Sequence, residues 1–343
     1  MKGDFTRRTF NPEKHYSSVR MQQGRVQLDA DWNEQVDIDL YAQRTLIRDT
    51  IGRTGVPIES PDGFSFRIQR DTSPQMFVVP GRIYVDGILC ELAQEASVNQ
   101  QPNFPAPIVD LQHIMERPSN NELATLLYLE VWEREITAFE DPNIVEVALG
   151  GTDTAIRTKV IWQVKAHDFV PQQDTEESVA QQALRISPEG RFRDLEPLDI
   201  SFDETEPPDG NQLYRVEIHE VSLNNTAIVP TFKWSRDNGS VIAAWRGGTG
   251  ASNDLAVIAG RTPVREGQFL EFTHDSLELL GSPGILRKIV LVREGAPGIQ
   301  RVEVDDSSGI AELLSTFVDD EQNQRFRKVR VWDSEIERAS CRE

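Results

Sequence analysis

The feature that most constrains this chain is one long amphipathic segment between Met21 and Gly52, in a sequence otherwise patterned as strands and turns. Apolar residues recur there at spacings of four and seven, which places them along one side of a helix with 3.6 residues per turn. We expect a helix that starts at Asp31, whose side chain caps the first turn, and ends at Ile51 before the stop signal of Gly52. The apolar stripe consists of Trp32, Val36, Leu40, Ile47 and Ile51.

A stripe of this length needs a surface to cover it, either the chain's own sheets or a neighbouring copy. We expect the stripe to be buried on the chain's own central β domain. The charged side of the helix, and the arm of residues 1–20 before it, are then free to meet another subunit. The arm mixes aromatic and basic residues, a composition that equally fits a terminal segment packed on its own domain. The candidate subunit interface comprises Phe5, Arg7, Arg8, Phe10, Tyr16, Arg25 and Trp32.

Turn-forming dipeptides divide most of the remaining sequence into short apolar runs. Asp86-Gly87 and Asn238-Gly239 favour type I′ hairpins, because both central residues of that turn need a positive φ. We expect the second hairpin to join the runs 232–235 and 241–245. Asp141, followed by proline, predicts the capped start of a two-turn helix over 143–149.

These patterns predict a mainly β protein with an N-terminal arm and a single long helix, a central β-sandwich-like domain, and a C-terminal small β barrel or sandwich. Alternating segments at 126–139 and 154–169 indicate central strands, and short runs between 255 and 332 supply the C-terminal ones. We expect an arm and helix at 1–57, a central β domain at 58–170 and 212–250, a linker or excursion at 171–211, a C-terminal β domain at 251–334 and a tail at 335–343.

Composition excludes several classes of partner. The net charge is −20, the wrong sign for a protein that binds nucleic acid or anionic lipid through its general surface. No apolar run approaches the roughly 20 residues that span a membrane. The two cysteines, Cys90 and Cys341, do not suggest a disulfide framework. We therefore expect synthesis in the cytoplasm, no nucleic-acid partner and no direct membrane insertion.

Motifs for catalysis are weak throughout. Paired carboxylates for glycoside hydrolysis could come from strand ends such as Glu217 and Glu271, but in a chain with 56 acidic residues such a choice has little specificity. The glycines at 247–250 lack the Lys-Ser/Thr of a phosphate loop. The histidines lack metal-ligand spacing, and the acids of the helix lack the pattern of a calcium loop. We expect no catalytic residue, no cofactor and no metal.

Several segments resemble an uncharacterised domain family. They are MQQGRVQLDADWNEQ at 21–35, VWERE at 131–135, ALGGTDTAIRTKVIWQVK at 148–165 and FKWSRDNGSV at 232–241. Members of that family are typically encoded in gene clusters for extracellular contractile injection systems, which are phage-tail-like particles. GRIYVDG at 81–87 is also similar to hairpins of phage baseplate proteins.

The resemblance implies a structural, virion-like particle component and assigns no enzymatic residues. We expect a baseplate-associated subunit or an accessory ring or cage layer, which self-assembles as a homo-oligomer and contacts other particle proteins. Release of the particle, or its attachment to a membrane through other subunits, stays open. The alternative is a carbohydrate-binding module or cell-wall-active enzyme built on a β-sandwich, because tryptophans recur in the strand patterns. Core packing is the commoner use of such tryptophans.

Overall fold

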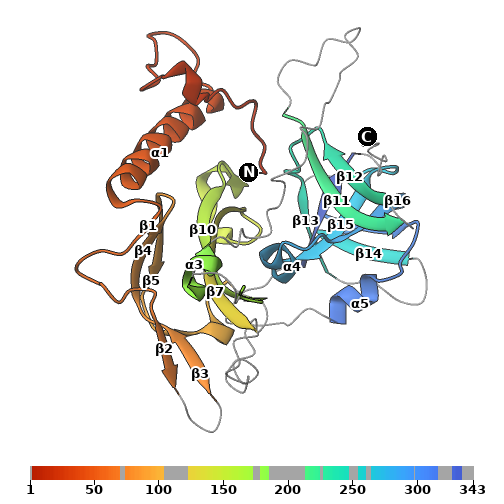
Figure 1. Ribbon diagram of the computed structural model, residues 1–343. Helices are drawn as coiled ribbons and strands as arrows, with labels where there is room; N and C mark the ends of the chain where they lie inside the picture. Colours follow the sequence, from red (N-terminus) through yellow and green to blue (C-terminus); the bar gives the residue numbers. More distant parts are fainter. Residues whose placement is uncertain are drawn as a thin grey trace. The chain divides into compact units, whose positions relative to one another are not determined.

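The computed structural model (Figure 1) supports the mainly β class expected from the sequence, with one long helix near the N-terminus and several antiparallel sheets. It describes residues 2–69, 74–103, 123–172, 178–184, 213–224, 227–246, 254–259, 264–296, 298–315 and 327–333. Most of the expected excursion at 171–211, the glycines at 247–250 and the tail at 335–343 lie outside these residues.

The chain forms two compact units, and each is built from separated segments. Unit 1 comprises residues 1–53, 133–161 and 211–343, and unit 2 comprises residues 54–132 and 162–210. The long paired strands β7 (Ala124–Ile136) and β10 (Arg157–Phe169) contribute residues to both units. Among the described residues, no helix is both long and apolar enough to cross a membrane.

A closed antiparallel barrel forms the centre of unit 1. Its strands neighbour one another in the order β13 (Ile242–Trp245), β14 (Asp254–Ala259), β17 (Ile299–Val304), β16 (Ile285–Glu294), β15 (Phe269–His274) and β18 (Arg327–Trp332). The expected C-terminal barrel is therefore present. Inward-facing apolar side chains alternate with outward-facing ones along each strand, as closure requires. The buried core includes Trp245, Leu270, Phe272, Ile289, Val302, Val329 and Val331.

Two short helices complete the barrel. α5 (Ile310–Ser315) adds Ile310 and Leu313 to the core. α4 (Asp275–Leu280) directly follows β15, and its first-turn acids suit the positive end of the helix dipole. Gly281 ends α4 with a φ of 67° and donates its N–H to the carbonyls of Glu278 and Leu277, the left-handed cap that favours glycine.

The expected hairpin at Asn238-Gly239 is only half correct. Asn238 and Gly239 have φ of 50° and 64°, and the Ser240 N–H donates to the Asp237 carbonyl at 2.9 Å, so the tight turn is present. The flanking strands, however, belong to different sheets. β12 (Ala227–Ser235) pairs with β11 (Arg215–Asn224), whereas β13 enters the barrel. The Asn-Gly sequence determines the tight turn, whereas burial of β13 in the barrel determines which strands it pairs with.

The predicted two-turn helix over 143–149 is also wrong. Asp141 does cap a helical turn, since its carboxylate accepts the Asn143 N–H. The turn is a 3₁₀ helix, η3 (Pro142–Ile144), and a strand bridge, β8 (Val145–Glu146), separates it from a second 3₁₀ turn, η4 (Val147–Leu149). β8 pairs with β9 (Thr152–Asp153), and this ladder replaces helical hydrogen bonds. A further 3₁₀ turn, η1 (Pro12–Lys14), lies in the arm.

Unit 2 consists of small sheets around its own core. One has the order β1 (Thr54–Gly55), β4 (Gly81–Val85), β5 (Ile88–Leu92), and another the order β2 (Phe66–Gln69), β3 (Gln75–Val78), β6 (Ala96–Ser97). The Asp86-Gly87 hairpin is confirmed, because both residues have positive φ and Val85 pairs with Ile88. η2 (Val98–Gln100) and α3 (Val179–Leu184) complete the unit. Its buried side chains include Phe64, Met76, Val78, Cys90, Leu92, Val98 and Trp162.

The long helix, α1 (Asp29–Ile51), starts two residues earlier than expected. Leu28 is its N-cap residue and provides no side-chain hydrogen bond, so the expected cap by Asp31 is wrong. Asp29 instead accepts hydrogen bonds from the backbone N–H and the hydroxyl of Thr6, at 3.0 and 2.8 Å. The N-terminal arm is thereby tied to the start of the helix.

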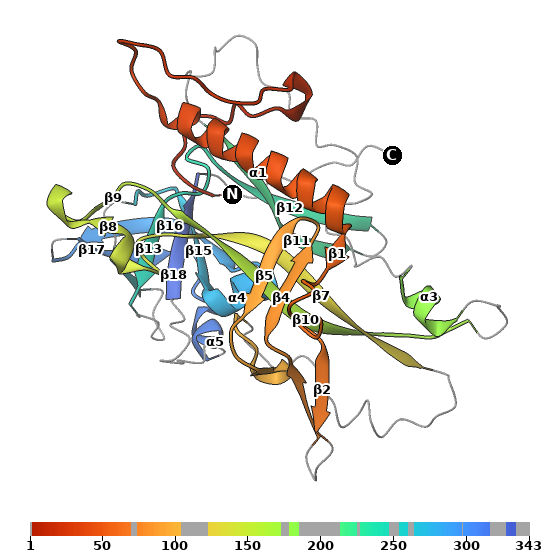
Figure 2. The same cartoon turned by 90° about the vertical axis from the view of Figure 1, so that its left-hand side faces the viewer.

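The side of α1 that meets its own chain buries Ala30 and Ile38, and the polar residues on that side have partners in the arm and in β7. Glu34 accepts from the Thr9 hydroxyl at 2.6 Å, and Gln35 accepts from the Val19 N–H at 2.7 Å. Arg44 pairs with Glu133 of β7 at 2.5 Å. Figure 2 shows the arm running back beside the helix. The arm, expected to be free, is therefore held on the helix.

The apolar stripe of α1 is exposed. Trp32, Val36 and Ile51 retain 59%, 52% and 44% of their surface, while Leu40 and Ile47 are half-buried. Within unit 1, the expected burial of this stripe on the chain's own β strands is therefore wrong for Trp32, Val36 and Ile51. The side turned inward carries Ala30 and Ile38, which are buried, beside polar residues that the arm and β7 contact.

Candidate site: a buried charge network on the barrel

The outer face of β15 and β18 is polar, yet it is buried. Thr273 lies opposite Lys328 and Glu271 opposite Arg330 in the ladder, and none of these four residues is more than 5% exposed. Burial of charge is strongly unfavourable unless each group is paired and hydrogen-bonded. Two groups of side chains from unit 1 supply these pairs.

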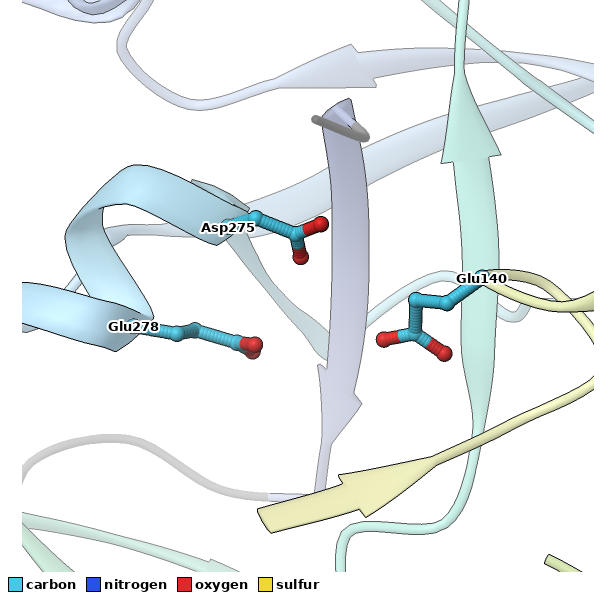
Figure 3. Close-up of side chains that lie close together, drawn as sticks. All are labelled: Glu140, Asp275 and Glu278. Carbon is cyan, nitrogen blue, oxygen red and sulfur yellow. The ribbon is translucent and has the colours of Figure 1, made fainter. Parts of the chain in front are cut away.

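The first group surrounds the Lys328 ammonium. Lys328 Nζ lies 2.7 Å from Glu140, 3.1 Å from Asp275 and 2.7 Å from Glu278. Asp275 and Glu278 come from α4, whereas Glu140 comes from the segment that follows β7. Figure 3 shows these three carboxylates converging on the strand β18 from two sides. Three distant segments of the chain therefore meet at one lysine.

Two arginines complete the balance of charge around this lysine. Arg134 Nη2 contacts Asp275 at 2.6 Å, Glu278 at 3.1 Å and Glu140 at 3.4 Å. Arg330 lies 3.6 Å from Glu278 and also donates to the carbonyl of Gly239. Hydrogen bonds to charged partners are the strong class.

Local structure holds the carboxylates in place. Glu140 closes a turn in which its N–H donates to the Thr137 carbonyl at 3.1 Å. The Glu140 side chain in turn accepts from the Thr137 N–H at 2.9 Å and from the Thr137 hydroxyl. Asp275 and Glu278 are three residues apart, so one helical face of α4 presents both.

Pairing with cations keeps these groups charged. Burial alone would raise the pKa of Glu140 and of Glu278, but attraction to Lys328 and its neighbouring arginines holds the pKa of both below the ordinary glutamate value. Burial alone would lower the pKa of Lys328, yet Glu278, Glu140 and Asp275 raise it above the ordinary lysine value. The lowered pKa of the glutamates and the raised pKa of Lys328 have one cause, the attraction between the ammonium and the three carboxylates.

Three converging carboxylates also resemble a cation site, since oxygens of Glu140, Asp275 and Glu278 all lie within 4.8 Å of one another. Calcium takes six to eight oxygen ligands. Here the Lys328 ammonium lies among the three oxygens and balances their charge, with Arg134 beside it. The donor set is therefore already satisfied by side chains of the chain itself.

The second group surrounds the ring of Trp332. Glu271 accepts the Trp332 indole N–H at 2.9 Å and pairs with Lys233 Nζ at 2.5 Å. Lys233 lies 4.5 Å from the centroid of the Trp332 ring and Lys2 lies 5.7 Å from it. Lys2 in turn pairs with Glu217 at 3.2 Å. The second group thus attaches β11, β12 and the N-terminus to the barrel.

This group contains both acids that the sequence offered as a glycosidase pair, Glu217 and Glu271. Burial would raise the pKa of each, but Lys2 and Lys233 outweigh it, lowering the pKa of Glu217 to about 2 and that of Glu271 below its ordinary value. A glycosidase needs one carboxylic acid that stays protonated to serve as the general acid. Two ionised carboxylates bridged by lysines do not supply it.

Cys90 also has the environment of a structural side chain. It is 1% exposed, and burial raises the pKa of its thiol to about 11. A thiol of this kind remains protonated at neutral pH and is a poor nucleophile.

The structure separates the seven residues of the sequence-derived interface. Arg7, Arg8, Tyr16, Arg25 and Trp32 are exposed, whereas Phe5 and Phe10 are half-buried. Phe10 packs on Tyr41 of α1 with ring centroids 5.7 Å apart, and Arg8 lies 3.7 Å from Asp37. Trp32 alone among the seven lies within α1. Whether these residues meet another subunit stays a prediction.

Sequence reasoning missed the charge network, although one signal was available. In β18 the residues Lys328, Arg330 and Trp332 alternate with Val329 and Val331, and alternation of this kind normally marks a solvent-exposed outer face. Nothing in the local sequence indicates that acids about 50 and 190 positions away in the chain cover this face.

The lowered pKa values predict acid lability. A carboxyl whose pKa is lower in the folded state stabilises the fold above its unfolded pKa, and the contribution is lost as the pH falls through the folded value. The pKa is lowered in four buried glutamates: Glu140, Glu217, Glu271 and Glu278. We therefore expect a constant free energy of unfolding above about pH 5 and a steady loss of it below about pH 4.3. Thermal unfolding at successive pH values measures it.

Glu278→Gln serves as the test variant for that pH dependence, and Glu59→Gln as its control. Glu59 lies 3.5 Å from Arg82 on the surface, where solvent screens the interaction. The variant at Glu278 should flatten the acid limb of the stability profile, whereas the control should leave it unchanged. If the wild type and both variants lose stability equally as the pH falls, the charge network does not cause the acid lability.

The fold and this site define a mainly β protein whose buried acidic clusters are paired with lysine and arginine. The profile of a protein family described as "Family of unknown function (DUF6519)" matches residues 1–187. The match covers more than half of the 343 residues, and the chain belongs to this family. No curated protein and no solved structure matches the chain.

Proposed function

We propose that this chain is a non-catalytic structural subunit of a contractile, phage-tail-like injection particle. It would lie at the baseplate or in an accessory ring or cage layer and bind copies of itself and other particle proteins. One observation carries the assembly role: α1 leaves Trp32, Val36 and Leu46 exposed, although its opposite side is held by the arm and β7. Exposed apolar patches on folded proteins commonly mark interaction sites. The sequence resemblance supports the kind of particle.

The chemistry of the buried groups agrees with a structural role. The carboxylates of the barrel are held ionised by lysine and arginine, and they join segments from the whole length of unit 1. Such networks fix one arrangement of a core when every member is paired. A particle subunit that transmits mechanical load benefits from that rigidity.

Tryptophan placement gives no support to the carbohydrate-binding alternative. Such a face requires exposed rings on a sheet. Trp162, Trp245 and Trp332 are buried and Trp132 and Trp234 half-buried, and the exposed one, Trp32, lies on the helix.

The test of this proposal is the composition of purified particles. We expect the chain, tagged in the organism that encodes it, to co-sediment with sheath and baseplate proteins at a fixed ratio measured by mass spectrometry. Trp32→Lys should reduce incorporation of the chain into particles, because it places a charge on the exposed apolar surface proposed to bind a partner. Since Trp32 is 59% exposed, the substitution leaves the fold intact. Val147→Lys, at 81% exposure in η4, is the control.

Deletion of the arm is not an adequate test, because Lys2 and Thr6 contribute to the chain's own fold. Absence of the tagged chain from intact particles would refute the proposal. Turnover of peptidoglycan, lost on substitution of an acidic pair, would favour the alternative.

A further inference from the structure

Apart from Asp29, which Thr6 of the arm contacts, the exposed side of α1 follows a pattern that neither the barrel nor the arm explains. Its residues recur at alternating spacings of three and four, and every one of them is exposed. This heptad spacing is typical of a helix that packs against another helix along a narrow seam. The seam consists of Asp29, Trp32, Val36, Asp39, Gln43, Leu46 and Thr50.

We propose that this seam binds the same seam of a second copy of the chain, with the two α1 helices antiparallel. The inference rests on the proposed assembly function and names its partner. The occupant is a second copy because the seam is complementary to itself when reversed.

The geometry of the seam is symmetric about position 41. In an antiparallel pair centred there, Val36 lies opposite Leu46 of the second copy, five positions on either side of the centre. Trp32 lies opposite Thr50, nine positions on either side. Val36 and Leu46 are 52% and 63% exposed, so each pair buries apolar surface that a single chain leaves in water.

Two polar members of the seam match in the same register. Asp39 lies opposite Gln43, two positions either side of the centre, where an amide N–H can donate to a carboxylate. A polar pair between the apolar pairs of a seam is a known means of fixing the register of paired helices.

Charge selects the antiparallel orientation. The segment Asp29–Asp39 contains five acidic residues and no lysine or arginine, whereas Arg44 and Arg48 follow in the second half of the helix. Acids at the start of a helix and bases at its end already complement the dipole of one helix. In a pair, a parallel arrangement would place like charges together, and only the antiparallel one places acids beside arginines.

Analytical ultracentrifugation of the purified full chain tests this pairing. We expect a concentration-dependent monomer–dimer equilibrium, weakened about tenfold or more by Val36→Glu and by Leu46→Lys. Mixing these two variants should restore association, because the introduced glutamate of one copy then faces the introduced lysine of the other, while the unchanged Leu46 and Val36 still face each other. In a parallel pair the introduced glutamate would face the unchanged Val36, and mixing would restore nothing.

Matched controls come from equally exposed apolar residues outside α1. Leu149→Lys in η4 and Val290→Glu in β16 start from 63% and 52% exposure and should leave the equilibrium unchanged. Circular dichroism of all variants verifies the fold.

Three results would overturn the pairing: a wild-type chain that stays monomeric at every concentration, equal effects of the controls, or no restoration in the mixture. A monomeric chain that still enters particles through Trp32 would show that another particle protein covers the seam. A dimer that is absent from particles would leave the pairing intact and refute the proposed function.

Discussion

Replacement of Lys328 by methionine is expected to destabilise the barrel by about 3–5 kcal/mol, the cost of breaking a buried ion pair by removing one partner. Lys328 is 1% exposed and contacts Glu140, Asp275 and Glu278. Methionine has a similar length and fills the same space, so packing changes little. The three carboxylates, in contrast, lose the cation on which all three converge. Thermal unfolding should shift by on the order of 10 °C.

A second substitution separates charge from packing in this experiment. Lys328→Met combined with Glu278→Gln removes one of the uncompensated carboxylates, so the double variant should be more stable than Lys328→Met alone. Arg293→Met is the control, because Arg293 and Glu303 form a largely exposed pair on the same barrel, worth less than about 1 kcal/mol. If Lys328→Met costs no more than this control, the network does not stabilise the barrel.

The strands of the barrel could be predicted because their signals are local. Short alternating runs between residues 254 and 332 correspond to β14, β15, β16, β17 and β18, each bounded by glycine, proline or polar residues. The closing strand β13 could not be assigned in the same way. A hairpin signal at Asn238-Gly239 favours pairing with β12, whereas the barrel core buries Ala243 and Trp245 of β13.

The orientation of α1 shows where pattern reasoning fails. Periodicity identified the helix and its stripe, and the usual rule places an apolar stripe against the core. The inward side of α1 instead buries Ala30 and Ile38, and Thr9, Val19 and Glu133 contact Glu34, Gln35 and Arg44 on that side. These partners lie far apart in sequence, so periodicity alone could not show which side of the helix is covered.

The charge network could not be predicted for a related reason. Lys328 is separated from Glu140 by 188 positions and from Asp275 by 53, and each alone is an ordinary surface-type residue. Only the closed barrel and the start of α4 bring them together. The sequence did offer Glu217 and Glu271 as a pair of acids. Their protonation and structural role, however, depend on the ion pairs with Lys2 and Lys233, and no local sequence pattern predicts where those lysines lie.

Replacement of Trp332 by alanine is the second change with a large expected effect, about 3–5 kcal/mol for loss of a fully buried tryptophan. The ring is 0% exposed, and Lys233 and Lys2 both lie over it. Its removal leaves a cavity between the barrel and β12 and takes the indole donor from Glu271. Denaturant unfolding measures the loss, and hydrogen exchange should report faster opening of the arm that Lys2 anchors.

Trp332→Phe distinguishes the ring from its N–H group. Phenylalanine retains most of the apolar contact and an aromatic face for the two lysines, but it leaves the Glu271 carboxylate without the 2.9 Å hydrogen bond. We expect an intermediate loss of about 1–3 kcal/mol, the cost of an unsatisfied buried acceptor, with little change in exchange at the arm. If the two variants lose equal stability and release the arm equally, the hydrogen bond to Glu271, and not the ring beneath the lysines, holds the N-terminus to the barrel.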